Sequence, residues 1–372
     1  MRTARWFAAP LLAVTLPLAA CGGADQNASQ TPAAANGAIT VAAPPTRPPS
    51  RIQVTDALPK TPPTGKKVVF LQCELPACER YVAGVKSAAA ALGWSAKIQV
   101  FKSANPGAGL QQAINERPDY IAITGIPTVA LKPQLKAAAA ARIPVISCAT
   151  PDRPEPAGYA VQCGGTLATD ADYLGRWMIN DAGGKAKVVA VSIPQFPVLN
   201  TETDWFKHNL KAKCPGCSFD TLDVSVQEVG GGAVPQKLVA YLQSHPDINY
   251  AYFTFNDLTR GVPAVLRTAG LDEKVKLVGA AGDASIMKDI GSTQAAWTIA
   301  PNVYSSWVMF DAMARLSVGE RLHDQYASSV YASPTWVVDN AESAKLLASS
   351  SYDWYGPAAF EQQFKALWQV GA

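Results

Sequence analysis

The stretch NPGAGLQQAINERPDYIAITGIPTVALKPQLKAAAAARIPVISC, residues 105–148, decides the fold. Its spacing of apolar residues predicts helices over 105–116 and 129–141. Between and after them lie two short apolar runs, 120–124 and 144–148, which we expect to be strands. Strands that are apolar on both faces and alternate with helices are typical of a parallel sheet covered on both sides.

The same alternation continues outward in both directions. It predicts further strands at 67–72, 96–101, 159–163, 186–193, 219–224, 250–255, 275–279 and 295–300, and further helices at 78–92, 169–181, 201–213, 233–244, 258–269, 284–290 and 303–316. Two such series predict an α/β fold with two doubly wound parallel-sheet lobes joined by a hinge. Ligands of open parallel sheets bind beyond the carboxyl ends of the strands, so two facing lobes would share a cleft there.

We expect an N-terminal lobe from residues 64–166 plus 301–331, and a C-terminal lobe and tail from residues 167–300 plus 332–372. Together these make about 310 residues, more than one hydrophobic core usually supports. Within the tail, the stretch 352–368 is predicted to be a loop and an amphipathic helix packed on a lobe.

The N-terminus has the pattern of an export signal. Arg2 and Arg5 precede an apolar run, 6–18, that is shorter than the ~20 residues a spanning helix needs. We therefore interpret 1–20 as a signal peptide. The run ends in LAACG, which resembles the bacterial lipoprotein box, so Cys21 is expected to be lipidated. A plain signal peptide followed by a chance Cys is the alternative. Either interpretation implies export; lipidation would place the protein on the extracytoplasmic face of the cell membrane.

Residues 21–63 are rich in Ala, Pro, Thr and Gly and show almost no apolar periodicity. A segment of this composition buries too little apolar surface to offset the entropy lost on ordering. We therefore expect a disordered tether between the lipid anchor and the lobes.

Charge and motifs exclude several functions. The formal net charge is +3, and no basic stripe is present, which argues against a nucleic-acid partner. The three histidines, His208, His245 and His323, lack the spacing of a metal site. Neither a Gly-x-Ser-x-Gly elbow nor a dinucleotide-binding glycine pattern is present. We expect no enzyme activity, no cofactor and no metal.

Six cysteines remain once Cys21 is assigned to lipid, an even number in an oxidising compartment. Six cysteines allow fifteen connectivities, and our hypothesis pairs neighbours along the chain. Cys214 and Cys217 bracket Pro-Gly, and they could instead form a redox-active pair. Their place in a loop after a helix favours a structural disulfide. The proposed pairs are Cys73 with Cys78, Cys148 with Cys163, and Cys214 with Cys217.

Four stretches carry a resemblance to a known family: RPDYIAI at 117–123, IPVIS at 143–147, HPDI at 245–248 followed by FND at 255–257, and VKLVGAAG at 275–282. In order and spacing they resemble the type I periplasmic binding proteins, especially the ribose-binding-protein-like group that serves sugar importers. The resemblance covers roughly residues 66–340. It implies two lobes that close on a small solute.

The resemblance also implies site positions. Asn256 matches a ligand-contacting Asn of the group, and an amide can both donate and accept a hydrogen bond. Other positions depart from the sugar binders: small or apolar residues replace their stacking aromatics, their Asp-Arg pair, a further Asp and a late Gln. The residues of this chain at those positions are, in the same order, Ala77 and Cys78, Ala149 and Thr150, Ala281, and Ala300. Because the charged residues of the sugar binders are missing here, the resemblance favours a solute that is less polar, larger or differently oriented than a pentose.

The candidate ligand-binding residues follow predicted strands or begin the helices after them. Several have an alternative role: Glu74 as a solvated loop charge, Trp205 as a core residue, Asp257 as an N-cap, Asn302 in hinge packing. Phe196 could stack on a ring or sugar face. The full set is Gln72, Glu74, Thr150, Gln195, Phe196, Asn200, Trp205, Asn256, Asp257 and Asn302.

Our functional hypothesis is a lipid-anchored solute-binding protein of an ABC importer, acting as a monomer that captures a small solute by hinge closure and delivers it to a membrane permease. The alternative is a sensor on the same scaffold that presents the bound solute to a membrane receptor.

Overall fold

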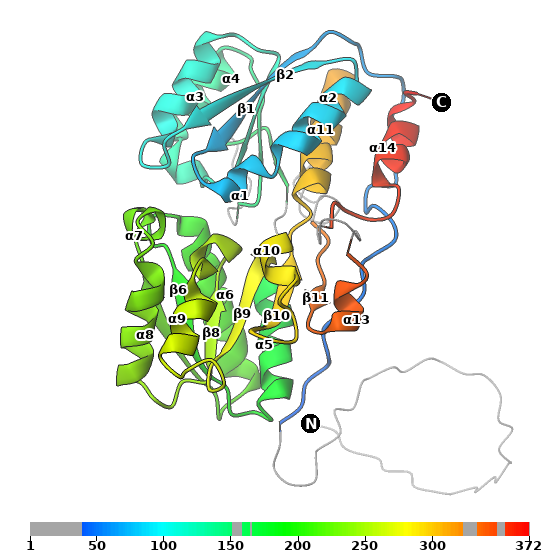
Figure 1. Ribbon diagram of the computed structural model, residues 1–372. Coiled ribbons are helices and arrows are strands. Elements are labelled where there is room, and N and C mark those ends of the chain that lie inside the picture. Colours follow the sequence, from blue (N-terminus) through cyan, green and yellow to red (C-terminus); the bar gives the residue numbers. More distant parts are fainter. Residues whose placement is uncertain (1–38, 151–157, 164–165, 323–332, 348–353, 372) are drawn as a thin grey trace, which may run out of the picture. The chain divides into compact units, whose positions relative to one another are not determined.

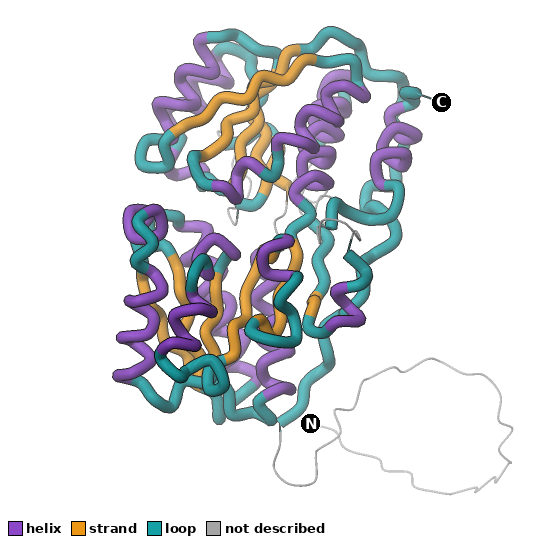
Figure 2. The backbone as a smooth tube through the Cα atoms, in the orientation of Figure 1, coloured by secondary structure: helices purple, strands orange, loops and turns teal. Residues whose placement is uncertain are grey.

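The computed structural model describes residues 39–150, 158–163, 166–322, 333–347 and 354–371. The expected signal peptide, Cys21 and the first part of the expected tether lie outside these residues. The described chain forms two α/β lobes, each built on one twisted sheet (Figures 1 and 2). None of its helices combines the length and apolarity that a membrane span requires.

The N-terminal lobe contains a parallel sheet of strand order β2-β1-β3-β4-β5. Alternate residues of β1 point to opposite faces: Val68 and Phe70 pack with α2, α11 and α14, whereas Val69 and Leu71 pack with α3 and α4. Both faces are therefore buried, as predicted. The elements are β1 (Lys67–Cys73), α1 (Pro76–Glu79), α2 (Val82–Ala91), β2 (Ser95–Phe101), α3 (Pro106–Asn115), β3 (Tyr120–Thr124), the 3-10 turn η1 (Thr128–Ala130), α4 (Lys132–Ala140), β4 (Val145–Cys148), β5 (Val161–Cys163), α11 (Asn302–Ser317) and α14 (Phe360–Trp368).

The C-terminal lobe contains a sheet of order β11-β10-β9-β8-β6-β7, parallel except for β11. Residues of β6 again alternate: Val189 and Val191 face α8 and α9, and Val188 and Ala190 face α5 and α6. The elements are α5 (Leu167–Asp181), β6 (Lys187–Ser192), α6 (Pro197–Lys213), β7 (Ser218–Asp223), α7 (Val226–Gly230), α8 (Val234–Ser244), β8 (Tyr250–Phe253), the 3-10 turn η2 (Asn256–Thr259), α9 (Val262–Thr268), β9 (Lys276–Gly282), α10 (Ala284–Met287), β10 (Gln294–Ile299), β11 (Val337–Val338) and α13 (Ala341–Ala344).

Two predicted helices are broken in the structure, and both breaks lie near the rims of the lobes. The helix expected over 78–92 divides into α1 and α2, with Arg80 between them. The helix expected over 258–269 begins instead as η2 and restarts as α9 after Gly261, whose φ of +79° is a left-handed conformation that glycine adopts without strain. Helix α7, begun by a Ser225 capping box, and strand β11 were not predicted.

The prediction of a disordered tether over 21–63 is wrong for residues 39–63. This segment, the strap, runs in extended form along both lobes (Figure 1). Val54 and Leu58 are 1% and 2% exposed in the N-terminal core, and Ile39 packs on the C-terminal core. The Pro45 carbonyl accepts a hydrogen bond of 2.9 Å from the backbone of β11. A few widely spaced apolar side chains are sufficient to order the strap, because each is buried in a core built mainly by the lobes.

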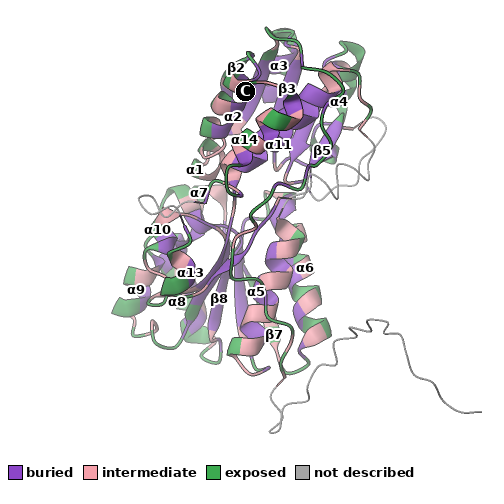
Figure 3. Cartoon of the chain, turned by 90° about the vertical axis from the view of Figure 1, so that its right-hand side faces the viewer, coloured by how far each residue is buried: buried purple, intermediate pink, exposed green. Residues whose placement is uncertain are grey.

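The C-terminal tail was assigned to the C-terminal lobe, and that assignment is wrong for α14. Its apolar residues recur every four positions and face α11 of the N-terminal lobe (Figure 3). Trp368 stacks on Trp307 at 5.1 Å between ring centroids, and its indole donates a hydrogen bond of 2.7 Å to the buried carboxylate of Asp311. That carboxylate also accepts a bond of 2.8 Å from Arg315. The amphipathic pattern predicted the helix, but not which lobe receives it.

The three disulfides join the neighbours along the chain that our hypothesis paired. Cys73–Cys78 ties the end of β1 to α1, and Cys148–Cys163 joins the ends of β4 and β5. Cys214–Cys217 closes the turn between α6 and β7. The first of these holds α1 at the rim where the lobes meet.

Candidate functional site

A cavity of about 180 Å³ lies between the two lobes, at the carboxyl ends of their strands. Both sheets turn this edge toward it, which is the location the parallel topology predicts. The residues that end or follow strands on its wall are Cys73, Thr124, Gly125, Ala149, Thr254, Phe255, Ala280, Ala281 and Ala300. The remaining wall comes from α1, from the first turns of α5 and α6, and from Asn302 at the start of α11.

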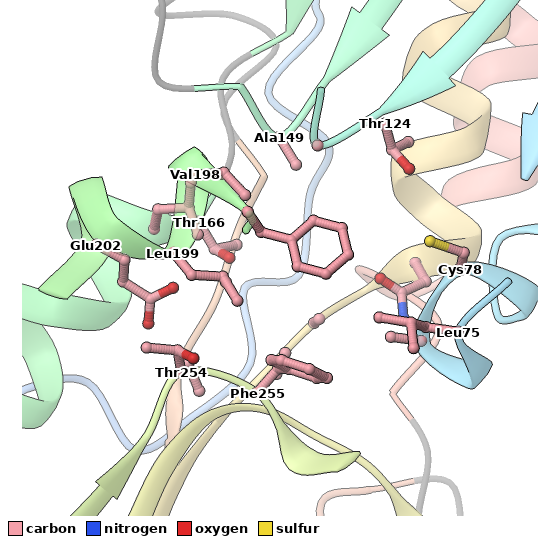
Figure 4. A pocket seen from close by; sticks show the side chains of 18 of the residues that line it. Leu75, Cys78, Thr124, Ala149, Thr166, Val198, Leu199, Glu202, Thr254 and Phe255 are labelled. Carbon is pink, nitrogen blue, oxygen red and sulfur yellow. The ribbon is translucent and has the colours of Figure 1, made fainter. Parts of the chain in front are cut away.

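The wall is mostly apolar. Phe196, Val198 and Leu199 contribute from the start of α6, and Leu75 and Phe255 add further apolar surface. Figure 4 shows Leu75 on the opposite side of the cavity from Val198 and Leu199. All five positions other than Thr150 at which this chain departs from the sugar binders line the cavity, and four of them are alanines. The positions that the resemblance implied therefore lie on the wall of this cavity. The small side chains there leave room but supply no polar side-chain contacts.

Two carboxyl groups on the C-terminal wall are fully buried. Asp170 of α5 is 2% exposed and Glu202 of α6 is 0% exposed. The Tyr252 hydroxyl donates a hydrogen bond to Glu202 Oε1. Asp170 Oδ1 and Glu202 Oε2 have no hydrogen-bond partner among the residues that the structure describes. Figure 4 shows the Glu202 carboxyl group directed inward beside Thr254 and Leu199.

Burial dominates the titration of this pair. Desolvation raises the pKa of Asp170 to about 7, although hydrogen bonds from nearby threonine side chains oppose the shift. Desolvation also raises the pKa of Glu202 well above its ordinary value, and the charge of Asp170 adds to the effect. The pair therefore retains protons near neutral pH in the protein without solute.

A cluster of charged side chains joins the lobes beside the cavity. Arg80, at the end of α1, donates a hydrogen bond of 2.9 Å to Asn256 Oδ1 and pairs with Asp257 Oδ1 at 3.2 Å and Asp283 Oδ2 at 2.8 Å. The backbone N–H of Ala77 donates to Asp257 Oδ2 at 3.2 Å. Burial raises the pKa of Asp257, and Arg80 opposes that rise. We call these residues the cross-lobe clamp.

Of the ten predicted ligand-binding residues, the structure places Phe196 and Asn302 on the cavity wall. Asn256 and Asp257 belong to the cross-lobe clamp and do not line the cavity. Arg80 donates to one oxygen of each, Asn256 Nδ2 donates to Asp283, and Asp257 Oδ2 accepts from the Ala77 backbone. Both take this position because η2 turns their side chains toward α1 instead of into the cavity.

Three other candidates have partners elsewhere. Glu74 accepts hydrogen bonds from the Ser103 backbone and hydroxyl, which outweigh partial burial and lower its pKa. Thr150 accepts a bond of 3.2 Å from Gln162. Asn200 is exposed and donates to the Pro194 carbonyl at 3.2 Å.

The last three do not line the cavity either. Trp205 packs against the C-terminal core, Gln195 is exposed, and Gln72 is half-buried within β1. The strand-end pattern predicted the rim on which the cavity lies, but it could not tell which of the side chains on that rim turn inward.

Sequence reasoning missed Asp170, Glu202 and Arg80, although the first two left a signal. On α6 the buried positions 198, 199, 202, 203, 206 and 210 form one stripe, and Glu202 lies within it. On α5, Asp170 shares the buried face with Leu174 and Met178. Asp and Glu are almost never fully buried unless they are paired, so an acid on an apolar stripe marks a candidate site. No group of three or more metal-ligating side chains occurs in the described residues.

Comparisons with known proteins agree with this geometry. Residues 76–321 match the family model described as periplasmic binding protein domain. No curated protein sequence matches the chain.

Solved structures with the same fold align with this chain over nearly all of their own length. One is a 5-methylthioribose transporter solute-binding protein from Thermotoga lettingae, with TM-score 0.67 and 18% identity over 84% of this chain and 99% of that one. Another is an ABC transporter solute-binding protein from Mycobacterium smegmatis with bound glycerol, with TM-score 0.66 and 19% identity over 78% and 99%. A third is a carbohydrate transporter from Acidothermus cellulolyticus with myo-inositol, with TM-score 0.64 and 17% identity over 76% and 96%. From the family match over most of its two lobes, we conclude that the chain belongs to the periplasmic binding proteins, with the type I fold.

Proposed function

We propose that this protein is the extracytoplasmic solute-binding component of an ABC importer, anchored by lipid at Cys21, which captures a small solute by hinge closure and delivers it to a membrane permease. The observation that carries the proposal is the cavity enclosed between the strand ends of two lobes. Family membership supports binding and not catalysis. The LAACG sequence at the end of the apolar N-terminal run supports the anchor.

The cross-lobe clamp supports the closing step. Arg80 comes from the N-terminal lobe, and Asn256, Asp257 and Asp283 come from the C-terminal lobe, so these contacts form only when the lobes are together. A solute that binds the closed form more tightly than the open form shifts the population toward closure. The clamp adds to that preference through contacts between the lobes.

The solute class follows from the wall. The neighbours that contain 5-methylthioribose, glycerol and myo-inositol support a small sugar-like or polyol-sized solute. The apolar wall of this chain, with Phe196 and Phe255, favours a solute with an apolar face.

The test is a thermal-shift screen of the mature protein against sugars, polyols, cyclitols, nucleosides and small amines, followed by calorimetry. A solute at 100 times its dissociation constant should add about 2.7 kcal/mol to the free energy of unfolding. Ala77→Trp, which places a large ring in the cavity from the short helix α1, should melt like the parent protein but show no ligand shift. A complete absence of binding across the screen would overturn the proposed function.

A further inference from the structure

The Asp170–Glu202 pair is a ligand-binding feature that the apolar wall does not explain. Each carboxyl group lines the cavity, is almost completely buried, and keeps one oxygen without a protein partner among the described residues. Buried acceptors are costly unless they are hydrogen-bonded. Two such oxygens in one cavity therefore indicate a bound polar group, and once the pair has released a proton that group has to donate hydrogen bonds.

The charges around the cavity select the kind of donor. Arg80 is the one basic side chain among the described residues that line it, and it already pairs with Asp257 and Asp283. The charge of Arg80 is thus balanced by these two residues and not by Asp170 or Glu202. An anionic solute would find no compensating base and would oppose ionisation of the pair, whereas a cation would be favoured by the carboxylate that forms when the pair loses a proton.

We propose that the cavity selects small solutes that carry a protonated amine, which binds between the free oxygens of Asp170 and Glu202 while the apolar face of the solute packs against Phe196, Leu199 and Phe255. An ammonium group has three donors and no acceptor, so it can satisfy both carboxyl groups at once. This inference rests on the proposed function and specifies the solute class of the same cavity.

Proton release follows from this arrangement. The titratable or charged groups around the cavity are Arg80 and Tyr81 from the N-terminal lobe, Asp170 on α5, Glu202 on α6, and Tyr252 on β8 behind Glu202. Burial raises the pKa of Tyr81 to about 12, so this group stays neutral. The acid pair holds protons near neutral pH, and a bound ammonium must displace one of them. Amine affinity should therefore rise with pH.

The experiment uses matched probes that differ by one group: cyclohexylamine with cyclohexanol, and glucosamine with glucose. Dissociation constants are measured by calorimetry at pH 6.0, 7.0 and 8.0, with the buffer varied to count released protons. The pH comparison uses cyclohexylamine, because its alkylammonium group stays protonated, like a Lys side chain, up to about pH 10. We expect cyclohexylamine to bind at least tenfold more tightly than cyclohexanol at pH 8.0, and about tenfold more tightly at pH 8.0 than at pH 6.0.

Variants separate the pair from general negative charge. Glu202→Gln and Asp170→Asn should each weaken amine binding about tenfold or more and reduce its pH dependence. Asp204→Asn removes an exposed carboxylate on the same helix as Glu202, and it should leave amine affinity unchanged.

Two negative results have different meanings. If the neutral probes or other neutral sugars bind as tightly as the amines, or if Glu202→Gln leaves the amine preference intact, the inference about amines is overturned and the solute-binding function stands. If neither amines nor any neutral solute binds, the proposed function is overturned together with the inference.

Discussion

Arg80 Nη2 lies 3.2 Å from Asp257 Oδ1, an ion pair that joins the two lobes through residues 177 positions apart in the chain. Asp257 is buried and Arg80 is largely so, which limits screening by solvent. Asp257 follows a strand of the C-terminal lobe, where a contact with solute was expected from the sequence. The structure pairs its carboxylate with the opposite lobe instead, as the proposed closure requires.

Arg80→Ala should shift the protein toward the open form. Losing a partly buried charge pair and its hydrogen bond to Asn256 should weaken the closed state by about 1–2 kcal/mol, which corresponds to roughly a fivefold to thirtyfold rise in the dissociation constant of any bound solute. Small-angle scattering of the protein without solute should show a larger radius of gyration. Calorimetry gives the affinity.

The matched control for this variant is Lys97→Ala. Lys97 pairs with Glu116 at 2.6 Å on the surface of the N-terminal lobe, so this ion pair lies within one lobe. It should change neither the radius of gyration nor the affinity. Equal effects of the two substitutions would show that the clamp has no role in closure.

Leu58→Ala should destabilise the N-terminal lobe although residue 58 lies in the strap. Its side chain is 2% exposed in the core, and truncating a buried Leu to Ala costs about 2–5 kcal/mol. The backbone bond of 2.8 Å from Leu58 N to the Leu367 carbonyl does not depend on the side chain and should remain. Thermal unfolding followed by tryptophan fluorescence, which reports Trp307 and Trp368 nearby, measures the loss.

Lys60→Ala is the control, because Lys60 is exposed two residues further along the same strap. Its free energy of unfolding should change by no more than about 0.5 kcal/mol, the range of ordinary surface substitutions. If Leu58→Ala melts like Lys60→Ala, the strap is not part of the folded core.

Asp170→Asn should change how stability depends on pH. Burial raises the pKa of Asp170 to about 7 in the folded protein, against 3.8 for an ordinary Asp. Between those values the folded state binds more protons than the unfolded state, so the free energy of unfolding falls as pH rises through this window. The amide cannot ionise, and the variant avoids that loss.

The difference in free energy of unfolding between Asp170→Asn and the parent protein should therefore shift in favour of the variant by about 1 kcal/mol or more from pH 5 to pH 8. Urea unfolding at pH 5, 6, 7 and 8 measures it, and Asp204→Asn provides an exposed carboxylate on α6 as the reference. Parallel pH profiles of parent and Asp170→Asn would contradict the raised pKa.

Local patterns were sufficient for the elements and for the rim of the site. The strand predicted over 120–124 coincides with β3, and most other strands agree to within a residue or two. Breaks at Arg80 and Gly261 were missed, because the apolar spacing continues through both positions while the backbone does not. The identities of the inward-facing side chains were poorly predicted, because strand-end position alone does not set side-chain direction.

The sequence by itself determined two parallel-sheet lobes, the sheet edges at which the cavity lies, and the cysteine pairs that lie close along the chain. These properties depend on periodicity and on short spacings, which a window of a few residues contains. Only the tertiary structure decided that Asp170 and Glu202 are buried in one cavity, that Arg80 meets Asp257, and that the strap enters both cores. Burial and charge pairing depend on residues contributed by distant elements, and no local pattern specifies which of those elements will meet.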